Sequence, residues 1–139
     1  HVAALDGKHV LFATLEMDND DLAVRAACSL DETDASALVT MSDESWRGFL
    51  TRALGEAQAQ KLHLHDDPDT TVFDVAAHAR RIRTEAAKRG HELGLVVVDY
   101  LQLVEHPMVS RDANRQQEVA AISRSLKKLS KELHVTVIA

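Results

Sequence analysis

The chain has 139 residues, 45% of them hydrophobic and 27% charged, with a formal net charge of −6 at pH 7. Such a length and composition are typical of one globular domain with a hydrophobic core, and no apolar run approaches the ~20 residues that span a membrane. Cys28 is the single cysteine, which excludes an internal disulfide and a cysteine-based zinc site. The apolar run over residues 10–13 is too short for a signal peptide, so we expect a reducing, cytoplasmic location and no membrane partner.

The first half of the chain predicts a strand followed by two amphipathic helices. In chain order we expect a strand, a helix, a polar irregular stretch and a second helix, over residues 9–15, 19–30, 31–41 and 43–60. Asp18 and Ser42 precede the two helices and are residue types that cap helix N-termini. Trp46 lies on the apolar face of the second helix, which favours a core position over a base-stacking surface.

The second half alternates strands and helices more regularly. In chain order we expect a short strand, a helix, a buried strand, a polar loop, a long helix and a final strand, over residues 61–65, 72–89, 95–99, 105–111, 112–133 and 134–139. Thr71 and Asp74 have the spacing of a capping box, and Gly90 is suited to end the helix that they begin. The alternation predicts βαβ units on a parallel sheet, within one domain.

The strand over residues 95–99 ends in the first candidate site residue, Asp99. The run Leu95-Val96-Val97-Val98 is typical of a strand buried on both faces of a parallel sheet, and it leads directly into the aspartate. Ligands of α/β proteins bind beyond the carboxyl ends of such strands. A carboxylate buried there needs a cation, which in nucleotide-hydrolysing enzymes is Mg²⁺. The structural alternative is an aspartate that ends a strand only to form a turn or a cap.

Glu16 is the second candidate, because it follows directly after the first predicted strand. The carboxyl ends of neighbouring parallel strands open on one crevice, so Glu16 and Asp99 are able to face the same nucleotide. The chemistry needs two different acids, one to hold Mg²⁺ and one to orient the attacking water. The alternative is a strand-end acid that only favours the N-terminus of the next helix.

Two further groups of polar side chains have simpler explanations. His63 and His65 face the same way on a predicted strand and are followed by Asp66 and Asp67, a set that resembles metal ligands. A turn at Asp66-Asp67-Pro68 accounts for the two acids, and we favour that interpretation. The arginines of the helix over residues 72–89 are interpreted as an exposed helix face.

Several blocks of sequence occur in the order expected of one protein family. They are Leu15-Glu16-Met17, then Val98-Asp99-Tyr100-Leu101-Gln102-Leu103, then Asn114-Arg115-Gln116-Gln117-Glu118-Val119 with Ile122-Ser123-Arg124-Ser125-Leu126-Lys127, and finally Lys131-Glu132-Leu133. Together they resemble the C-terminal motor domain of DnaB-type replicative DNA helicases, across essentially the whole chain. The resemblance implies an α/β fold, a RecA-like P-loop NTPase core with a mostly parallel sheet flanked by helices. It also implies that residues 1–139 are a partial motor domain, incomplete at both ends.

The resemblance implies ATP and Mg²⁺ as cofactors and gives each candidate acid a role. Glu16 matches the catalytic glutamate that activates water, and Asp99 matches the Walker B aspartate that holds Mg²⁺ with ATP. The family's G-x-x-x-x-G-K-[ST] phosphate loop does not occur in this sequence, so no cofactor-binding residue is assigned. We expect that loop before His1, and the sensor glutamine, the DNA-gripping loop and the arginine finger beyond Ala139. This piece is therefore predicted not to hydrolyse ATP alone.

The partners implied by the resemblance are single-stranded DNA, the other subunits of a homo-hexameric ring, a primase and a helicase loader. Arg111 and Arg115, in or just after the loop that follows Asp99, are candidate contacts to DNA or to a neighbouring subunit. Two alternatives stay open. One is a RecA-like recombinase or clock-type ATPase, which usually lacks the blocks around Asp99 and Arg115. The other is a degenerate RecA-like module that only mediates assembly.

Overall fold

The computed structural model describes residues 7–30, 32–59, 61–109 and 114–139. Its elements follow the order β1 (His9–Thr14), α2 (Asn19–Leu30), η1 (Ala35–Thr40), α3 (Asp43–Ala59), β2 (Leu62–His65), α4 (Val72–Lys88), β3 (Leu93–Asp99), η2 (Leu101–Leu103), α5 (Arg115–Leu133) and β4 (Thr136–Ile138), where η1 and η2 are 3₁₀ helices. None of the described helices is long and apolar enough to cross a membrane.

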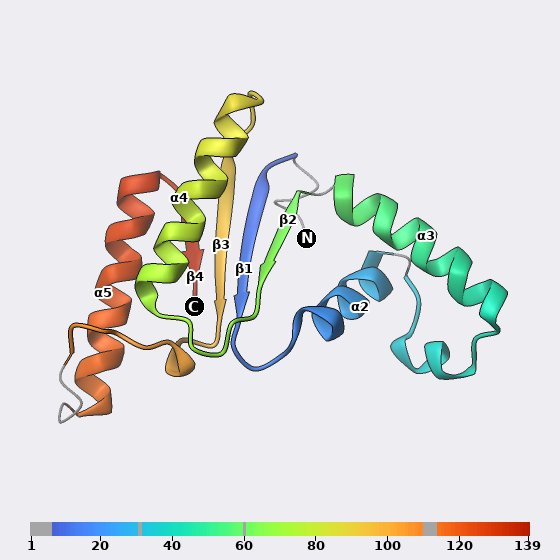
Figure 1. The fold of residues 1–139 in the computed structure, drawn as a ribbon, viewed down its shortest axis with the longest axis horizontal. Helices are drawn as coiled ribbons and strands as arrows, with labels where there is room; N and C mark the ends of the chain where they lie inside the picture. Colours follow the sequence, from blue (N-terminus) through green and yellow to red (C-terminus); the bar gives the residue numbers. More distant parts are fainter. Residues whose placement is uncertain (1–6, 31, 60, 110–113) are drawn as a thin grey trace.

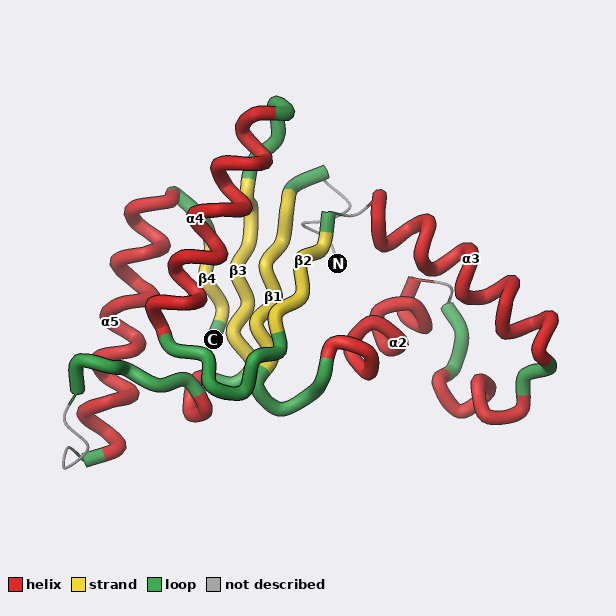
Figure 2. Tube along the Cα trace, viewed as in Figure 1, coloured by secondary structure: helices red, strands yellow, loops and turns green. Residues whose placement is uncertain are grey.

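The strands form one parallel sheet in the order β2-β1-β3-β4 (Figures 1 and 2). β1 lies between β2 and β3 and pairs in parallel with both, and β3 pairs in parallel with β4. All strands therefore end at the same edge of the sheet, which is the lower edge in Figure 1. The predicted parallel sheet built from βαβ units is confirmed.

Helices α4 and α5 cover one face of this sheet and enclose the main core. Leu11 and Ala13 of β1 and Val96 and Val98 of β3 point into it, and α5 contributes Ile122 from the other side. Successive strand residues point to opposite faces. Accordingly Phe12, Leu95 and Val97, on the second face, are only partly buried. Residues 95–98 are thus buried on the face that α4 and α5 cover and only partly buried on the other, where the sequence predicts burial on both.

The ends of α4 follow the sequence signals closely. Thr71 accepts a hydrogen bond from the Asp74 amide, and Asp74 accepts one from the Thr71 amide, which confirms the capping box. At the other end, Gly90 has a φ of +73°, a backbone conformation that costs glycine little. The His91 amide then donates to the Ala86 carbonyl, 3.0 Å away, and the helix stops.

Several elements differ from the sequence-based prediction, and three of the differences are informative. The stretch predicted to be irregular contains the 3₁₀ helix η1, capped by Asp34, whose side chain accepts from the Ser36 amide. β3 begins at Leu93, because Leu93 pairs with His9 and is buried. Gly94 is the extra residue of a bulge, and a side chain there would collide with Lys8. α5 begins at Arg115, because the backbone of Asn114 is extended and its side chain caps the helix, so the prediction that residue 114 is helical is wrong. The two residues before it in the predicted helix lie outside the described residues.

Helices α2 and α3, with η1 between them, form a second region beside β2 and away from α4 and α5 (Figure 1). We call residues 19–59 the arm, and the sheet with α4 and α5 the sheet body. Within the described side chains of the arm, Ala27, Cys28 and Phe49 form a separate core cluster. Trp46 packs against this core, with its ring centroid 5.6 Å from that of Phe49, which confirms its predicted core position.

Candidate functional site

The two candidate acids lie at the ends of adjacent strands. β1 and β3 are neighbours, and Thr14, the last residue of β1, is in register with Asp99, the last residue of β3. The pairing continues one residue further, because the Leu15 amide donates to the Asp99 carbonyl at 2.9 Å. Glu16 is the next residue. The prediction that neighbouring strand ends carry these acids to one edge of the sheet is therefore correct.

A tight turn holds the segment that carries Glu16. The Thr14 hydroxyl donates to the Met17 carbonyl at 3.0 Å and accepts from the Met17 amide at 3.2 Å. Thr14 itself is 2% exposed, so the turn is anchored in the body of the sheet. Asp18 then caps α2 through a 2.8 Å bond from the Asp21 amide. Between these two anchors the Glu16 side chain is exposed.

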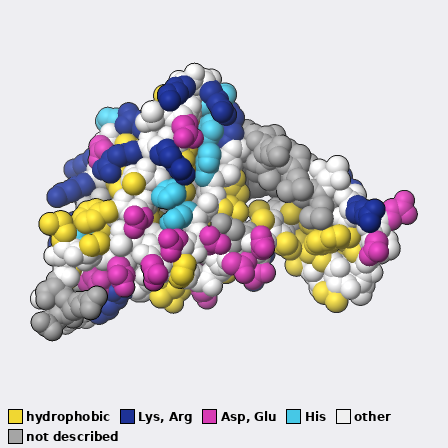
Figure 3. Space-filling view, in the orientation of Figure 1, with side chains coloured by type: hydrophobic (Ala, Val, Ile, Leu, Met, Phe, Trp, Pro, Cys, Tyr) yellow, Lys and Arg dark blue, Asp and Glu magenta, His cyan; other side chains and the backbone are white. Residues whose placement is uncertain are grey.

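Asp99 is also exposed, which corrects the expectation of a buried carboxylate. As the last residue of β3 it lies at the rim of the sheet, beyond the strand residues that α4 and α5 cover. Among the described residues, neither Asp99 nor Glu16 takes part in an ion pair or a side-chain hydrogen bond. Acidic side chains gather along this lower edge, and basic ones lie higher, over α4 (Figure 3).

Of the two arginines predicted to contact DNA or another subunit, the structure describes one. Arg111 lies outside the described residues. Arg115, at the start of α5, donates hydrogen bonds to the Gln102 carbonyl and to the Glu118 carboxylate, and its side chain remains 47% exposed. Its contact with DNA or with another subunit stays a prediction. Sequence reasoning missed Glu118, whose only signal was its spacing of three residues from Arg115 on one helix.

The histidines of β2 are partly buried and contact neighbouring side chains. His63 Nε2 lies 2.7 Å from His9 Nδ1, and His65 Nε2 lies 2.8 Å from the Thr70 hydroxyl. Burial lowers the pKa of His9, with the neighbouring His63 adding to the effect, and burial also lowers the pKa of His63 and of His78. Within the described residues there is no group of three or more histidine, cysteine or acidic side chains that could hold a metal ion.

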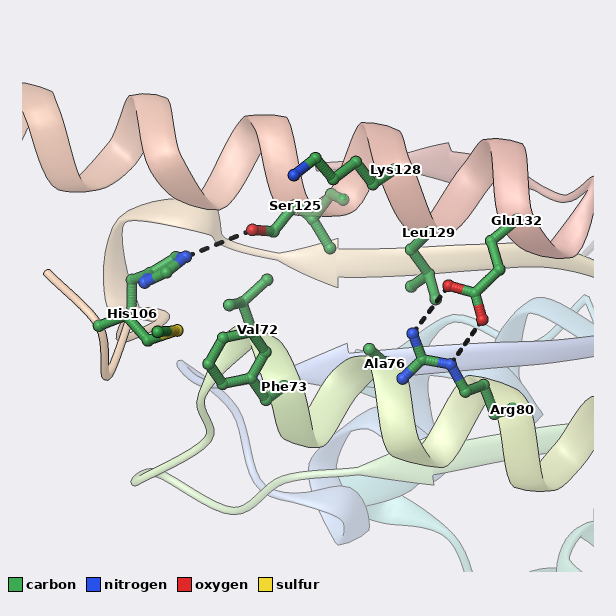
Figure 4. Close-up of a pocket in the computed structure, with 11 residues that line it drawn as sticks. Val72, Phe73, Ala76, Arg80, His106, Ser125, Lys128, Leu129 and Glu132 are labelled. Atoms are coloured by element: carbon green, nitrogen blue, oxygen red, sulfur yellow. Dashed lines mark hydrogen bonds and ion pairs between the residues drawn. The ribbon is translucent and has the colours of Figure 1, made fainter.

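A groove of about 350 Å³ runs between α4 and α5, on the outer side of the sheet body (Figure 4). Phe73 and His106 lie at one end, with their rings edge to face, and the Arg80–Glu132 ion pair lies at the other. Neither candidate acid lines this groove. It is therefore not the site that the sequence analysis predicts.

The chain is similar to known replicative helicases along its full length. A family model of the DnaB-like helicase C-terminal domain matches residues 1–139. A replicative DNA helicase DnaB of Geobacillus stearothermophilus is 39% identical over 141 residues, which cover 100% of this chain and 30% of that protein. The DnaB of Mycobacterium intracellulare is 37% identical over 132 residues, which cover 94% of this chain and 21% of that protein. The chain thus spans less than a third of these relatives.

Two solved structures share the fold. A DnaB-like replicative helicase, described together with its interactions with primase, matches with a TM-score of 0.80 and 27% identity over 98% of this chain and 32% of that one. The second, described as an ATPase domain, matches with a TM-score of 0.73 and 27% identity over 98% of this chain and 47% of that one. These likenesses, with the parallel sheet and its flanking helices, confirm the predicted RecA-like α/β core.

Proposed function

Because this chain belongs to the family of DnaB-like helicase C-terminal domains, we propose that it is part of the motor of an ATP-dependent replicative DNA helicase. The full-length protein would couple ATP hydrolysis to translocation on single-stranded DNA and to duplex unwinding. The observation that carries the proposal is the meeting of Glu16 and Asp99 at one edge of the sheet, joined through the bond from Leu15 to Asp99. Ligands of parallel α/β sheets bind at this edge.

We assign the two acids different tasks in ATP hydrolysis. Asp99 holds Mg²⁺ together with ATP, since carboxylate oxygens suit this ion and the side chain has no other partner in the described part of the chain. When bound, Mg²⁺ neutralises charge on the phosphates. Glu16 accepts a hydrogen bond from the attacking water and orients it. Its turn, anchored at Thr14, supports a fixed position for this task.

The assembly around the motor is part of the same proposal. We infer that the full-length protein forms a homo-hexamer around single-stranded DNA in the cytoplasm, with Arg111 and Arg115 as contacts to DNA or to a neighbouring subunit. A primase and a helicase loader are further proposed partners, and one related helicase is described with primase. The phosphate-loop pattern does not occur in these 139 residues, so we expect that they do not turn over ATP alone.

The family match favours this interpretation over a recombinase-type ATPase, since the relatives carry the name of replicative helicases. A degenerate module that only mediates assembly is the remaining alternative. It predicts a different result in the experiment below, because it needs neither acid for its activity.

The test is ATP hydrolysis by the full-length protein, with and without single-stranded DNA. We expect Glu16→Gln to lower DNA-stimulated turnover by about 10²- to 10⁴-fold, the usual effect of losing a group that activates water, while ATP still binds. Glu44→Gln, an exposed acid at the start of α3, is the matched control and is expected to leave turnover unchanged. A rate of ATP hydrolysis that changes neither on addition of DNA nor in the Glu16→Gln variant would contradict the helicase assignment.

A further inference from the structure

The loop that follows Asp99 has little hydrophobic anchoring of its own. The chain turns at once into η2, where the Leu103 amide donates to the Tyr100 carbonyl at 3.0 Å. Within residues 100–106 only Val104 is buried, at 1% exposure, whereas Tyr100 and Leu103 are 38% and 39% exposed. Burial therefore holds this loop at Val104 and, in part, at Leu101, which packs against the main core, and the rest of its course depends on polar contacts.

Those polar contacts come from the first turn of α5 and meet at one carboxylate. The Arg115 guanidinium donates to the Gln102 carbonyl and also to Glu118 Oε2. The other oxygen of the same carboxylate, Glu118 Oε1, accepts from the His106 amide at 3.3 Å. Glu118 thus holds both ends of the segment from Gln102 to His106, through Arg115 at one end and directly at the other. Hydrogen bonds with a charged partner are the stronger kind.

We call Arg115 and Glu118, with the Gln102 carbonyl and the His106 amide, the Glu118 clamp. The Glu118 side chain is 22% exposed, so the clamp is largely shielded from water at its centre. His106 adds a second link to α5, because its Nε2 lies 3.3 Å from the Ser125 hydroxyl (Figure 4). The loop is thereby tied to α5 at positions seven residues apart along the helix, which fixes its direction as well as its place.

The same loop is tied to α4 on its other side. The Val72 amide donates to the Glu105 carbonyl at 2.9 Å, and the Glu105 amide donates to the Thr70 carbonyl at 3.3 Å. Upstream of the loop, the Asp99 carbonyl accepts from Leu15 of the neighbouring strand connection. Asp99 therefore lies between a backbone anchor on β1 and a loop whose path the clamp determines.

We propose that Arg115 and Glu118 are positioning residues for Asp99, which rests on the proposed function of Asp99 as the Mg²⁺ ligand. Neither residue touches the ion or the nucleotide in this account; both act through the backbone that leaves Asp99. A binding constellation works only when its groups are held to within about 0.5 Å by their supporting contacts. Residues that orient a metal ligand typically matter by about 10- to 100-fold in metal affinity or activity.

The experiment measures the Mg²⁺ concentration that gives half-maximal ATP hydrolysis by the full-length protein. For Arg115→Gln and Glu118→Gln we expect this concentration to rise about 10- to 100-fold. Amide hydrogen exchange over residues 100–106 should quicken in the same variants. Arg115→Lys should give an intermediate shift, since it keeps the charge but lacks the planar fork that serves two acceptors. The double variant should shift no further than either single one, because the clamp acts as a unit.

The matched control is Arg80→Gln, which breaks an ion pair between α4 and α5 without touching the loop. Arg80 Nε lies 2.7 Å from Glu132 Oε1, and both side chains are about half exposed. Arg80→Gln is expected to leave the Mg²⁺ requirement unchanged. If Arg80→Gln, Arg115→Gln and Glu118→Gln all lower the thermal stability, only an effect on the metal site would raise the Mg²⁺ requirement in the last two and not in the first.

Two results would overturn different parts of the account. If Arg115→Gln and Glu118→Gln quicken exchange in the loop but match the control in Mg²⁺ requirement, the clamp is only structural and the inference is wrong. Asp99→Asn distinguishes this from a failure of the premise. Should Asp99→Asn also leave the Mg²⁺ requirement at the wild-type value, the proposed function of Asp99 itself is wrong. A shift in Asp99→Asn together with both clamp variants is the result that we expect.

Discussion

The sheet body and the arm differ in how many of their described hydrophobic side chains are buried. The core of the sheet body draws buried side chains from β1, β3, α4, α5 and the loop residue Val104. Among the described side chains of the arm, the buried core consists of Ala27, Cys28 and Phe49, and η1 contributes no buried residue to it. Because stability in proteins comes mainly from buried apolar surface, the arm is expected to open locally at a lower cost than the sheet body.

This difference separates the two candidate acids. Asp99 belongs wholly to the sheet body, with the Glu118 clamp on one side and the bond from Leu15 on the other. Glu16 lies on the connection from β1 to α2, so one of its neighbours along the chain leads into the arm. A conformational change in the arm is therefore expected to displace Glu16 more than Asp99. Asp99 thus lies within the sheet body, and Glu16 lies on the connection between the sheet body and the arm.

The largest expected effect breaks the sheet body. Ile122 of α5 is fully buried under the sheet, so Ile122→Ala should destabilise the domain by about 2–5 kcal/mol. Hydrogen exchange of the full-length protein, read region by region, is the measurement. Exchange should quicken in all four strands together. A loss confined to α5 would show that the sheet body is not one cooperative unit.

A matched truncation in the arm should cost less. Phe49 is also fully buried, yet Phe49→Ala should lower the stability of the sheet body by less than about 3 kcal/mol, the low end for this substitution. The reason is that the substitution removes contacts within the arm. When the arm opens locally, the strands keep their own contacts, so their stability is not lowered by the full cost of the substitution. Exchange should quicken in α2 and α3 and stay slow in β1 and β3. Equal quickening in both regions would contradict the distinction between them.

The helix caps provide a finer comparison of the same kind. Thr71→Ala removes the cap of α4 and should cost the sheet body about 1 kcal/mol. Asp18→Ala removes the equivalent bond at α2, where the Asp21 amide loses its acceptor. We expect chemical denaturation monitored at the sheet body to register the first substitution and not the second. Similar shifts for both caps would mean that the arm and the sheet body unfold together.

Acid should weaken the sheet body gradually, which is the smallest effect. The pKa of His9 and of His63 lies below the ordinary value of 6.5, chiefly because their burial, partial for His63, disfavours the charged forms. The folded protein thus favours their neutral forms, and their contribution is complete above about pH 6.5 and is lost as the pH falls through the lowered values. His63→Gln should flatten the decline of the thermal midpoint below about pH 6.5. An unchanged decline would exclude this pair as its source.

The sequence was most informative where local chemistry decides the structure. The cap at Thr71, the helix end at Gly90 and the valine run leading to Asp99 all depend on residues close together in the chain, and each was predicted. The adjacency of Glu16 and Asp99 also followed, because parallel strands in βαβ units place their ends at one edge. The exposure of Asp99 did not follow, because it depends on which elements cover the rim.

Contacts between distant segments could not be read from the sequence. The His106 amide donates to Glu118, which lies beyond the loop, and His9 contacts His63 on the neighbouring strand. No periodic pattern in the sequence indicates either contact. The half-buried second face of the sheet was hidden for a related reason. Leu95 and Val97 have the apolar character of core residues, and only the three-dimensional arrangement of α4 and α5 reveals which face is covered.

The central claim is that the two acids do different work at one edge of the sheet. The most direct test compares Mg²⁺-dependent ATP binding and single-turnover hydrolysis in full-length Glu16→Gln and Asp99→Asn proteins. Glu16→Gln is predicted to bind Mg²⁺ and ATP like the wild type and to lose hydrolysis, whereas Asp99→Asn is predicted to lose at least about tenfold in Mg²⁺-dependent binding. Two variants with the same defect, or an Asp99→Asn protein with wild-type binding, would contradict the account.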